Sequence, residues 1–159
     1  MATPAKSEPK AVAQNRRASH DYFLGERVEA GLVLTGTEVK SLREGKASLA
    51  EAWVRLDENG EAWLVQAHIQ EYSHAGTLAQ HDPTRKRKLL LHRRELDLLG
   101  KEMAVKGATL VPTKLYFKDG YAKVEIAVGT GKAGHDKRQA IASRDAKRDI
   151  DRAIKARRR

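Results

Sequence analysis

Two tight turns constrain the fold of this chain more than any other feature of its 159 residues. They are Asn59-Gly60, between the apolar stretches 52–56 and 62–69, and Asp119-Gly120, between the stretches 109–117 and 121–128. Asn-Gly and Asp-Gly pairs adopt the positive φ angles that two-residue β-hairpin turns require, so each pair predicts a hairpin. In the arm 121–128, apolar residues at even positions alternate with Lys123 and Glu125, which predicts a strand with one buried face and one outward face.

The remaining segments complete a mainly β pattern. Residues 27–34 alternate apolar and other side chains, which predicts a half-buried strand with Glu29 on its outward face. Thr35 and Glu38 have the spacing of a capping box that begins a short helix, and leucine and methionine recur at helical spacing over 96–103. No strand–helix–strand unit long enough for a parallel sheet is evident. We therefore expect a small five- or six-stranded β-barrel of the oligonucleotide-binding type, with two or three short helices.

Positive charge is concentrated at the two ends of the chain. Residues 1–19 contain four bases and one acid, residues 132–159 contain eleven bases and four acids, and the segment between them is neutral. We expect a disordered tail at 1–14, the barrel at 15–131 and a disordered basic tail at 132–159. Good helix formers in 139–159 predict that the second tail becomes helical along a polyanion. Cationic tails beside a neutral body are typical of a polyanion-binding protein, although they can also serve solubility alone.

The composition excludes several classes of protein. The chain has no cysteine, which excludes a disulfide scaffold, a cysteine-based zinc or iron–sulfur site and a thiol nucleophile. Its six histidines lack the helical spacing of a zinc site, and no catalytic constellation is recognisable, so we expect no metal, no cofactor and no enzyme. Residues 129–134 match the dinucleotide-binding pattern G-x-G-x-x-G, but no further strand follows, so a flexible hinge is the better interpretation. No apolar run approaches the roughly 18 residues of a membrane span, and we expect a cytoplasmic protein.

A run of bases lies inside the neutral body. Arg85-Lys86-Arg87-Lys88 precedes Leu89-Leu90-Leu91, and Arg93 and Arg94 follow. The leucines anchor this segment as a strand, which predicts that its bases are held in position to contact phosphates; the candidates are Arg85, Arg87 and Lys88. The alternative is a solvated charged strand. Glu29 lies on the outward face of its strand. It must either form a salt bridge with a lysine or arginine or accept a hydrogen bond from a nucleobase.

Five short stretches form a distinctive series. They are Glu29-Ala30-Gly31-Leu32, Gly36-Thr37-Glu38-Val39-Lys40-Ser41-Leu42-Arg43, Asp82-Pro83-Thr84-Arg85, Arg87-Lys88-Leu89-Leu90-Leu91 and His135-Asp136-Lys137-Arg138. Each stretch is weak alone, but jointly, in this order and spacing, they resemble the SmpB family, the SsrA-binding proteins of bacteria. The resemblance implies an oligonucleotide-binding barrel with a disordered C-terminal tail, which acts as an RNA-binding adaptor.

The resemblance also implies a role in trans-translation, the rescue of ribosomes stalled on an mRNA that lacks a stop codon. The barrel would bind the elbow of the tRNA-like domain of transfer-messenger RNA. The positions that match the family's RNA-binding residues are Glu29, Leu90, His92 and Lys123. The basic tail would enter the small-subunit decoding centre and the empty mRNA channel of the ribosome, where it becomes helical. Its matching motif is Lys132, His135, Asp136, Lys137 and Arg138. Elongation factor Tu would accompany the charged RNA.

The chain departs from the family pattern at two positions, and one alternative function fits the same residues. Ala133 stands where relatives often carry a second lysine, and His92 stands where some relatives carry asparagine. The rival is a general translation-associated or ribosomal RNA-binding protein with the same barrel. Such a protein would bind many structured RNAs with similar affinity, whereas the adaptor requires a preference for a tRNA-like elbow.

Overall fold

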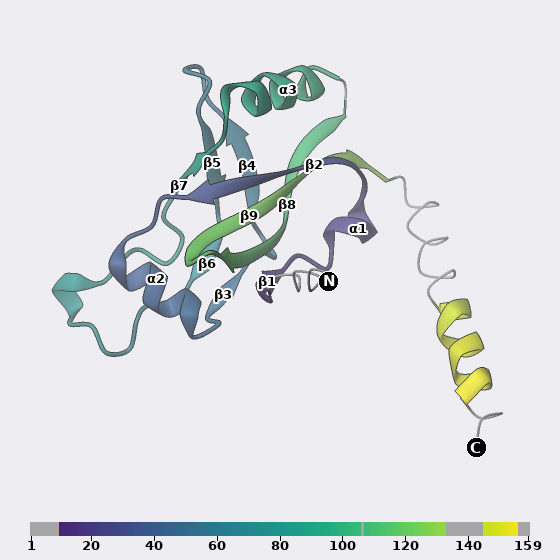
Figure 1. Cartoon of the computed structure of the whole chain (residues 1–159), viewed down its shortest axis with the longest axis horizontal. Coiled ribbons are helices and arrows are strands. Elements are labelled where there is room, and N and C mark those ends of the chain that lie inside the picture. The colour runs from purple at the N-terminus through teal and green to yellow at the C-terminus, as the bar shows by residue number, and fades with distance from the viewer. Residues whose placement is uncertain (1–9, 106, 133–144, 156–159) are drawn as a thin grey trace, which may run out of the picture.

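The computed structural model describes residues 10–105, 107–132 and 145–155 (Figure 1). Its strands are β1 (Ala11–Gln14), β2 (Tyr22–Leu32), β3 (Ala47–Ser48), β4 (Trp53–Leu56), β5 (Ala62–Val65), β6 (His68–Ile69), β7 (Arg87–Leu90), β8 (Ala108–Lys118) and β9 (Tyr121–Gly131). Its helices are α1 (Ala18–Asp21), α2 (Gly36–Arg43), the 3₁₀ turn η1 (Thr77–Ala79), α3 (Arg93–Met103) and a helix at 145–155. None of the helices in these described ranges is long and apolar enough to cross a membrane.

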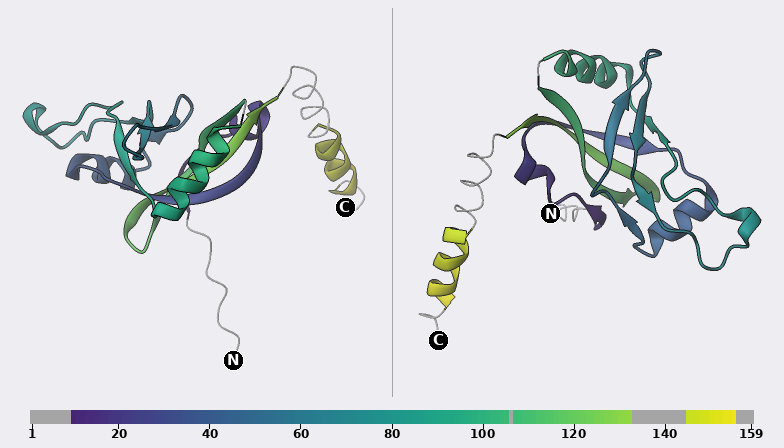
Figure 2. Two further views of the ribbon diagram at one scale, coloured as in Figure 1. Left: turned by 90° about the horizontal axis from the view of Figure 1, so that it is seen from above. Right: turned by 180° about the vertical axis from the view of Figure 1, so that it is seen from behind.

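Seven strands form one antiparallel sheet in the order β1-β8-β9-β2-β7-β5-β4, and β3 pairs separately with β6. The sheet is strongly curved, as the views from above and behind show (Figure 2). Its edge strand β4 contacts β8, its other edge strand β1 contacts β3, and α3 packs against β8 and β9. The prediction of a mainly β fold with short helices is confirmed, and the sheet has more strands than the five or six expected.

Both predicted hairpins are present. Gly60 has a φ angle of 76° in the β4–β5 connection, and Asp119 and Gly120 have φ angles of 52° and 83° between β8 and β9. The pairing of β8 with β9 extends from Lys118 opposite Tyr121 to Ala108 opposite Thr130. Its register shifts once, between Pro112 and Lys114. The predicted arm 62–69 is divided into β5 and β6, because Gln66 turns the chain with a φ angle of 61°.

Residues 11–14 form strand β1, so the prediction of disorder up to residue 14 is wrong for this part of the chain. β1 pairs with β8, with Ala13 opposite Leu115, and Ala13 is buried. Just after β1, the side-chain amide of Asn15 donates a hydrogen bond of 3.1 Å to the Pro112 carbonyl, 97 residues away. Because the partner strand is so distant, the local composition carries no signal for the pairing. Residues 1–9 lie outside the described part of the chain.

β9 continues through Gly129 and Gly131, where the glycine pattern suggested a flexible hinge. Gly131 pairs with Tyr22 of β2. A Cβ atom on Gly129 would lie 3.1 Å from the Cβ of Tyr22 and 3.1 Å from a methyl group of Val111. Gly129 therefore permits the close approach of neighbouring strands, and the hinge interpretation is wrong for these two glycines. Gly134, the third glycine of the pattern, lies outside the described residues.

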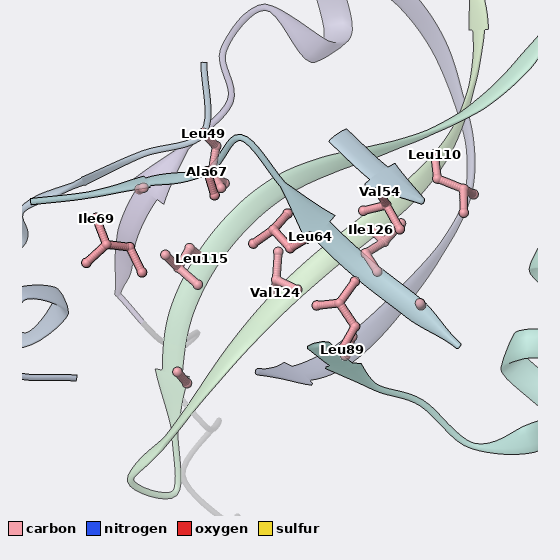
Figure 3. Packing of buried hydrophobic residues seen from close by; sticks show 14 of the residues in the cluster. Leu49, Val54, Leu64, Ala67, Ile69, Leu89, Leu110, Leu115, Val124 and Ile126 are labelled. Atoms are coloured by element: carbon pink, nitrogen blue, oxygen red, sulfur yellow. The ribbon is translucent and has the colours of Figure 1, made fainter. Parts of the chain in front are cut away.

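The hydrophobic core lies inside the curve of the sheet (Figure 3). Its labelled members in the figure are Leu49, Val54, Leu64, Ala67, Ile69, Leu89, Leu110, Leu115, Val124 and Ile126. Val124 and Ile126 are completely buried, whereas Lys123 and Glu125 between and beside them are only partly buried and lie on the outer face of β9. The alternation predicted for this strand is confirmed, and it determines which side chains the sheet presents to a partner.

An ion pair is buried beside this core. Glu38 of α2 and Arg87 of β7 are both fully buried, and the guanidinium Nε of Arg87 donates a hydrogen bond to the Glu38 carboxylate. The other guanidinium nitrogens donate to the Ala67 carbonyl (2.8 Å) and the Pro83 carbonyl (3.1 Å). The pair thus connects α2, β7, the β5–β6 link and the loop before β7.

Two further donors complete the surroundings of Glu38. Its carboxylate accepts hydrogen bonds from the Thr35 backbone N–H (2.9 Å) and from Nη2 of Arg85 (2.6 Å), which confirms the predicted capping box. Burial alone favours the protonated acid, but the hydrogen bonds from Arg85, Thr35 and Arg87 outweigh it and hold the pKa of Glu38 below its ordinary value. Glu38 is therefore ionised at neutral pH and balances the charge of Arg87.

We predict that Glu38→Gln destabilises the protein by about 3–5 kcal/mol, because it leaves the Arg87 charge buried without its counter-charge. Urea unfolding followed by circular dichroism measures the change. Glu61→Gln is the matched control, since Glu61 forms a half-exposed ion pair with Lys88 (3.2 Å) whose loss costs at most about 1 kcal/mol. Equal free energies of unfolding for the two variants would show that the buried ion pair stabilises the fold no more than the half-exposed one.

The stabilising effect of Glu38 should also depend on pH. Its folded-state pKa lies below its unfolded value, so its contribution is present above the unfolded pKa of about 4.3 and is lost as the pH falls through the folded pKa. We expect the difference in unfolding free energy between the wild type and Glu38→Gln to narrow between about pH 5 and pH 3. Urea titrations across this range test the idea, and a difference that does not change with pH would contradict it.

Candidate nucleic-acid interface

Three strands place Leu90, Gly31 and Lys123 in one row on the outer face of the sheet. Gly31 of β2 is paired with Leu90 of β7 on one side and with Lys123 of β9 on the other. A Cβ atom on Gly31 would lie 3.4 Å from the Cβ of Leu90 and 3.7 Å from Nζ of Lys123. A side chain at Gly31 would therefore contact both the leucine and the ammonium group, so the glycine leaves the space between them open. Leu90 is 54% exposed, which is unusual for a leucine inside a sheet.

Glu29 lies on the same strand two residues before Gly31 and therefore on the same face. Its carboxylate accepts a hydrogen bond from the Tyr116 hydroxyl and forms an ion pair with Nζ of Lys118 at 3.4 Å. Of the two alternatives for Glu29, the salt bridge with a basic side chain is the one present in the isolated chain. The Tyr116 hydrogen bond, with Lys118 and Lys123, holds the pKa of Glu29 below its ordinary value, so a charged acceptor faces the solvent beside Lys123.

His92 lies between β7, the strand of Leu90, and helix α3. It is the N-cap residue of the helix, and its backbone N–H donates a hydrogen bond of 3.1 Å to the Glu95 carboxylate. The imidazole is exposed, two residues beyond Leu90. The structure thus brings the predicted positions Glu29, Leu90 and Lys123 together on adjacent strands and places His92 at their margin.

The four bases of residues 85–88, two before β7 and two in it, do not form one surface. Arg87 is fully buried and its guanidinium is occupied by Glu38 and backbone carbonyls, so the prediction that it contacts a phosphate is wrong. Its position alternates with Lys88, and the alternation of a strand sends every second side chain inward. Arg85 is partly exposed but also bound to Glu38. Lys88 is 40% exposed and paired with Glu61 at 3.2 Å.

Lys132 is attached to the body of the protein. Its backbone N–H donates to the Asp21 carbonyl (2.9 Å), and its Nζ donates to the Ser19 carbonyl (2.9 Å). The same Nζ lies 4.9 Å from the centre of the Phe23 ring. The other members of the predicted tail motif, His135, Asp136, Lys137 and Arg138, lie outside the described residues. In the helix at 145–155 every side chain is exposed, so this helix does not bury a face against the sheet.

Sequence reasoning missed Tyr116 and Lys118, which hold Glu29 in place. The position of Tyr116 could have been predicted from the Asp119-Gly120 turn. A two-residue turn at Asp119-Gly120 places Lys118 opposite Tyr121 and Tyr116 opposite Lys123, as the observed register has it. The side chain across from Lys123 could therefore have been read from the turn. The contact of Tyr116 with Glu29 needs the β2–β9 register as well, which no local pattern supplies.

The chain matches one protein family over most of its length. The family model described as SmpB protein matches residues 12–156. A protein named SsrA-binding protein from Thermobifida fusca is 55% identical over 150 residues, which cover 94% of this chain and 92% of the relative. The protein of the same name from Streptomyces avermitilis is 56% identical, over 92% of this chain and 82% of the relative.

A solved structure is similar to this chain in sequence and in fold. It comes from work described as "tmRNA-SmpB: a journey to the center of the bacterial ribosome", and it matches with a TM-score of 0.64 and 46% identity. The match covers 80% of this chain and 92% of that chain. The family model and the relatives both extend over nearly the whole sequence, from β1 to the helix at 145–155. This chain belongs to the SmpB family.

Proposed function

We propose that this protein is the RNA-binding adaptor of trans-translation: it binds the tRNA-like domain of transfer-messenger RNA and brings it to stalled ribosomes. Relatives that are more than half identical carry the name SsrA-binding protein, and the matched solved structure concerns tmRNA and SmpB on the bacterial ribosome. The observation that carries the proposal within this chain is the row Leu90, Gly31 and Lys123 with Glu29 beside it. The proposed role requires binding and positioning, and no catalytic step.

The chemistry of this row suits a folded RNA. The ammonium group of Lys123 offers a charge to a phosphate, and Glu29 offers an acceptor to the amino or imino edge of an unpaired base. Exposed Leu90 offers an apolar surface to a base or ribose, as elbows of folded RNAs present bases outside a regular duplex. Gly31 has no side chain on this face, so the RNA backbone can approach the sheet closely between Leu90 and Lys123.

The basic tail supplies the second half of the proposal. Residues 132–159 contain eleven bases and four acids, and an mRNA channel without mRNA is lined by ribosomal RNA phosphates. Entry of the tail would release counterions from these phosphates, whereas mRNA in the channel would exclude the tail. We propose that Lys132, His135, Asp136, Lys137 and Arg138 lead the tail through the decoding centre. We also propose that the protein works in the cytoplasm and that elongation factor Tu accompanies the charged RNA.

Variants of the sheet face test the RNA-binding site. We expect Lys123→Gln to weaken binding of the tRNA-like domain, transcribed in vitro, and to reduce the slope of log K against log salt concentration by about 0.7–0.9. Leu90→Ala should weaken binding about fivefold, or about 1 kcal/mol, without changing the slope, because it removes an apolar contact. Filter binding at several salt concentrations measures both quantities.

Lys101→Gln is the control for these variants, since Lys101 is an exposed lysine at the far end of α3 from His92. Wild-type binding by Lys123→Gln and Leu90→Ala together would show that the RNA lies elsewhere. If ribosomal RNA fragments of similar size compete as well as the tRNA-like domain, the general RNA-binding function is the correct one.

Removal of the tail should separate RNA binding from ribosome rescue. A chain that ends at Lys132 keeps the contacts of Lys132 with Ser19 and Asp21, so the sheet face is undisturbed. We expect it to bind the tRNA-like domain with unchanged affinity and to give no tagging of peptides on ribosomes stalled in a purified translation system. Full tagging by the shortened chain would contradict the proposed role of the tail.

A further inference from the structure

Lys86 differs from the other three bases in the run Arg85-Lys86-Arg87-Lys88. Arg85 and Arg87 are bound to Glu38, and Lys88 is bound to Glu61. Within the described residues, no carboxylate lies within ion-pair distance of the Lys86 ammonium group. Instead, Nζ of Lys86 lies 4.4 Å from the centre of the Trp63 ring. A cation held by an aromatic ring keeps its full charge, so Lys86 is the base in this run that still lacks an anion.

The Trp63 ring that holds Lys86 is itself fixed. Its indole Nε1 donates a hydrogen bond of 2.9 Å to the Asp57 carboxylate. The other oxygen of Asp57 accepts hydrogen bonds from the backbone N–H groups of Asn59 (3.0 Å) and Glu61 (2.8 Å), which close the β4–β5 turn. The position of the Lys86 ammonium is therefore connected, through the ring and the carboxylate, to a hairpin turn.

Lys86 points to the same face as the proposed RNA-binding row. In β7, Arg87 and Leu89 are buried, whereas Lys88 and Leu90 lie on the outer face. Lys86 precedes Lys88 by two residues and is exposed, so it continues this outward series. Lys86 lies directly before β7, and at about 3.3 Å per extended residue it is about 13 Å from Leu90 along the chain. Trp63 of β5 is paired with Lys88, which makes the outer face continuous from β5 through β7 and β2 to β9.

We propose that Lys86 is a phosphate-binding residue that Trp63 holds in position, and that it extends the RNA-binding face from Leu90 and Lys123 to β5. This inference rests on the proposed function, since the phosphate belongs to the RNA bound at that row. An RNA phosphate supplies the anion that Lys86 lacks. Because the ring already restricts the long side chain, little conformational entropy is lost when the phosphate binds.

Salt-dependent binding of the tRNA-like domain, transcribed in vitro, to the full chain tests this proposal. Lys86→Gln should weaken binding and reduce the slope of log K against log salt by about 0.7–0.9, the effect of one lost phosphate contact. Lys86→Arg should restore both. Trp63→Leu should weaken binding but leave the slope unchanged, because the charge remains while its position is lost. Trp63→Phe keeps an aromatic face and should retain most of the affinity.

Two comparisons make the result decisive. In the double variant Lys86→Gln/Trp63→Leu, binding should be no weaker than in Lys86→Gln alone, because the ring acts through the lysine. Additive losses would refute the positioning role of Trp63. Lys46→Gln, which removes a lysine paired with Glu44 (3.2 Å) in the loop after α2, controls for a loss of positive charge in general. If Trp63→Leu does not fold, Asp57→Asn loosens the indole instead.

The outcome also separates this inference from the proposed function. Wild-type affinity and slope for Lys86→Gln, together with weakened binding by Lys123→Gln, would overturn the extension to β5 and leave the proposed RNA-binding row intact. Wild-type behaviour of both variants would overturn the row as well. Weakened binding by both, each with a reduced slope, supports one continuous face.

Discussion

The buried ion pair between Glu38 and Arg87 fixes which side chains of β7 lie on the outer face of the sheet. Because Arg87 turns inward to meet Glu38, the alternation of β7 sends Lys86, Lys88 and Leu90 outward. The same guanidinium binds the Ala67 and Pro83 carbonyls, so the loop before β7 and the β5–β6 link are held together at this point. A buried charged group thus decides which side chains of β7 form the outer surface.

The candidate site is made by register between strands, and no pocket is needed for it. Leu90, Gly31 and Lys123 come from three strands that are far apart in the chain: α2 and strands β3 to β6 lie between β2 and β7, and α3 and β8 lie between β7 and β9. Each is an ordinary residue in its own segment. They become neighbours because β2 pairs with β7 on one side and β9 on the other. A glycine in the middle of the row is as important to this surface as the lysine beside it.

The sequence predicts those features that depend on residues close together in the chain. The two hairpins, the capping box of Thr35 and Glu38, and the outward direction of Lys123 follow from local patterns, and the structure contains all of them. The pairing of strand β1 and the ion pair of Arg87 with Glu38 depend on partners far away in sequence, and no local pattern indicates these contacts. For the same reason, a run of four bases gives no sign that three of them are neutralised by acids and that Lys86 is not.

The length of β9 has a consequence for how two partners are spaced. Lys123 lies near the beginning of this strand and Lys132 directly after its end, so about 30 Å of extended chain separates the proposed RNA-binding row from the first residue of the basic segment. β9 is hydrogen-bonded to β2 on one side and β8 on the other, and a doubly paired strand neither stretches nor folds back. The fold therefore fixes the distance between the row of Leu90, Gly31 and Lys123 and Lys132, where the basic segment begins.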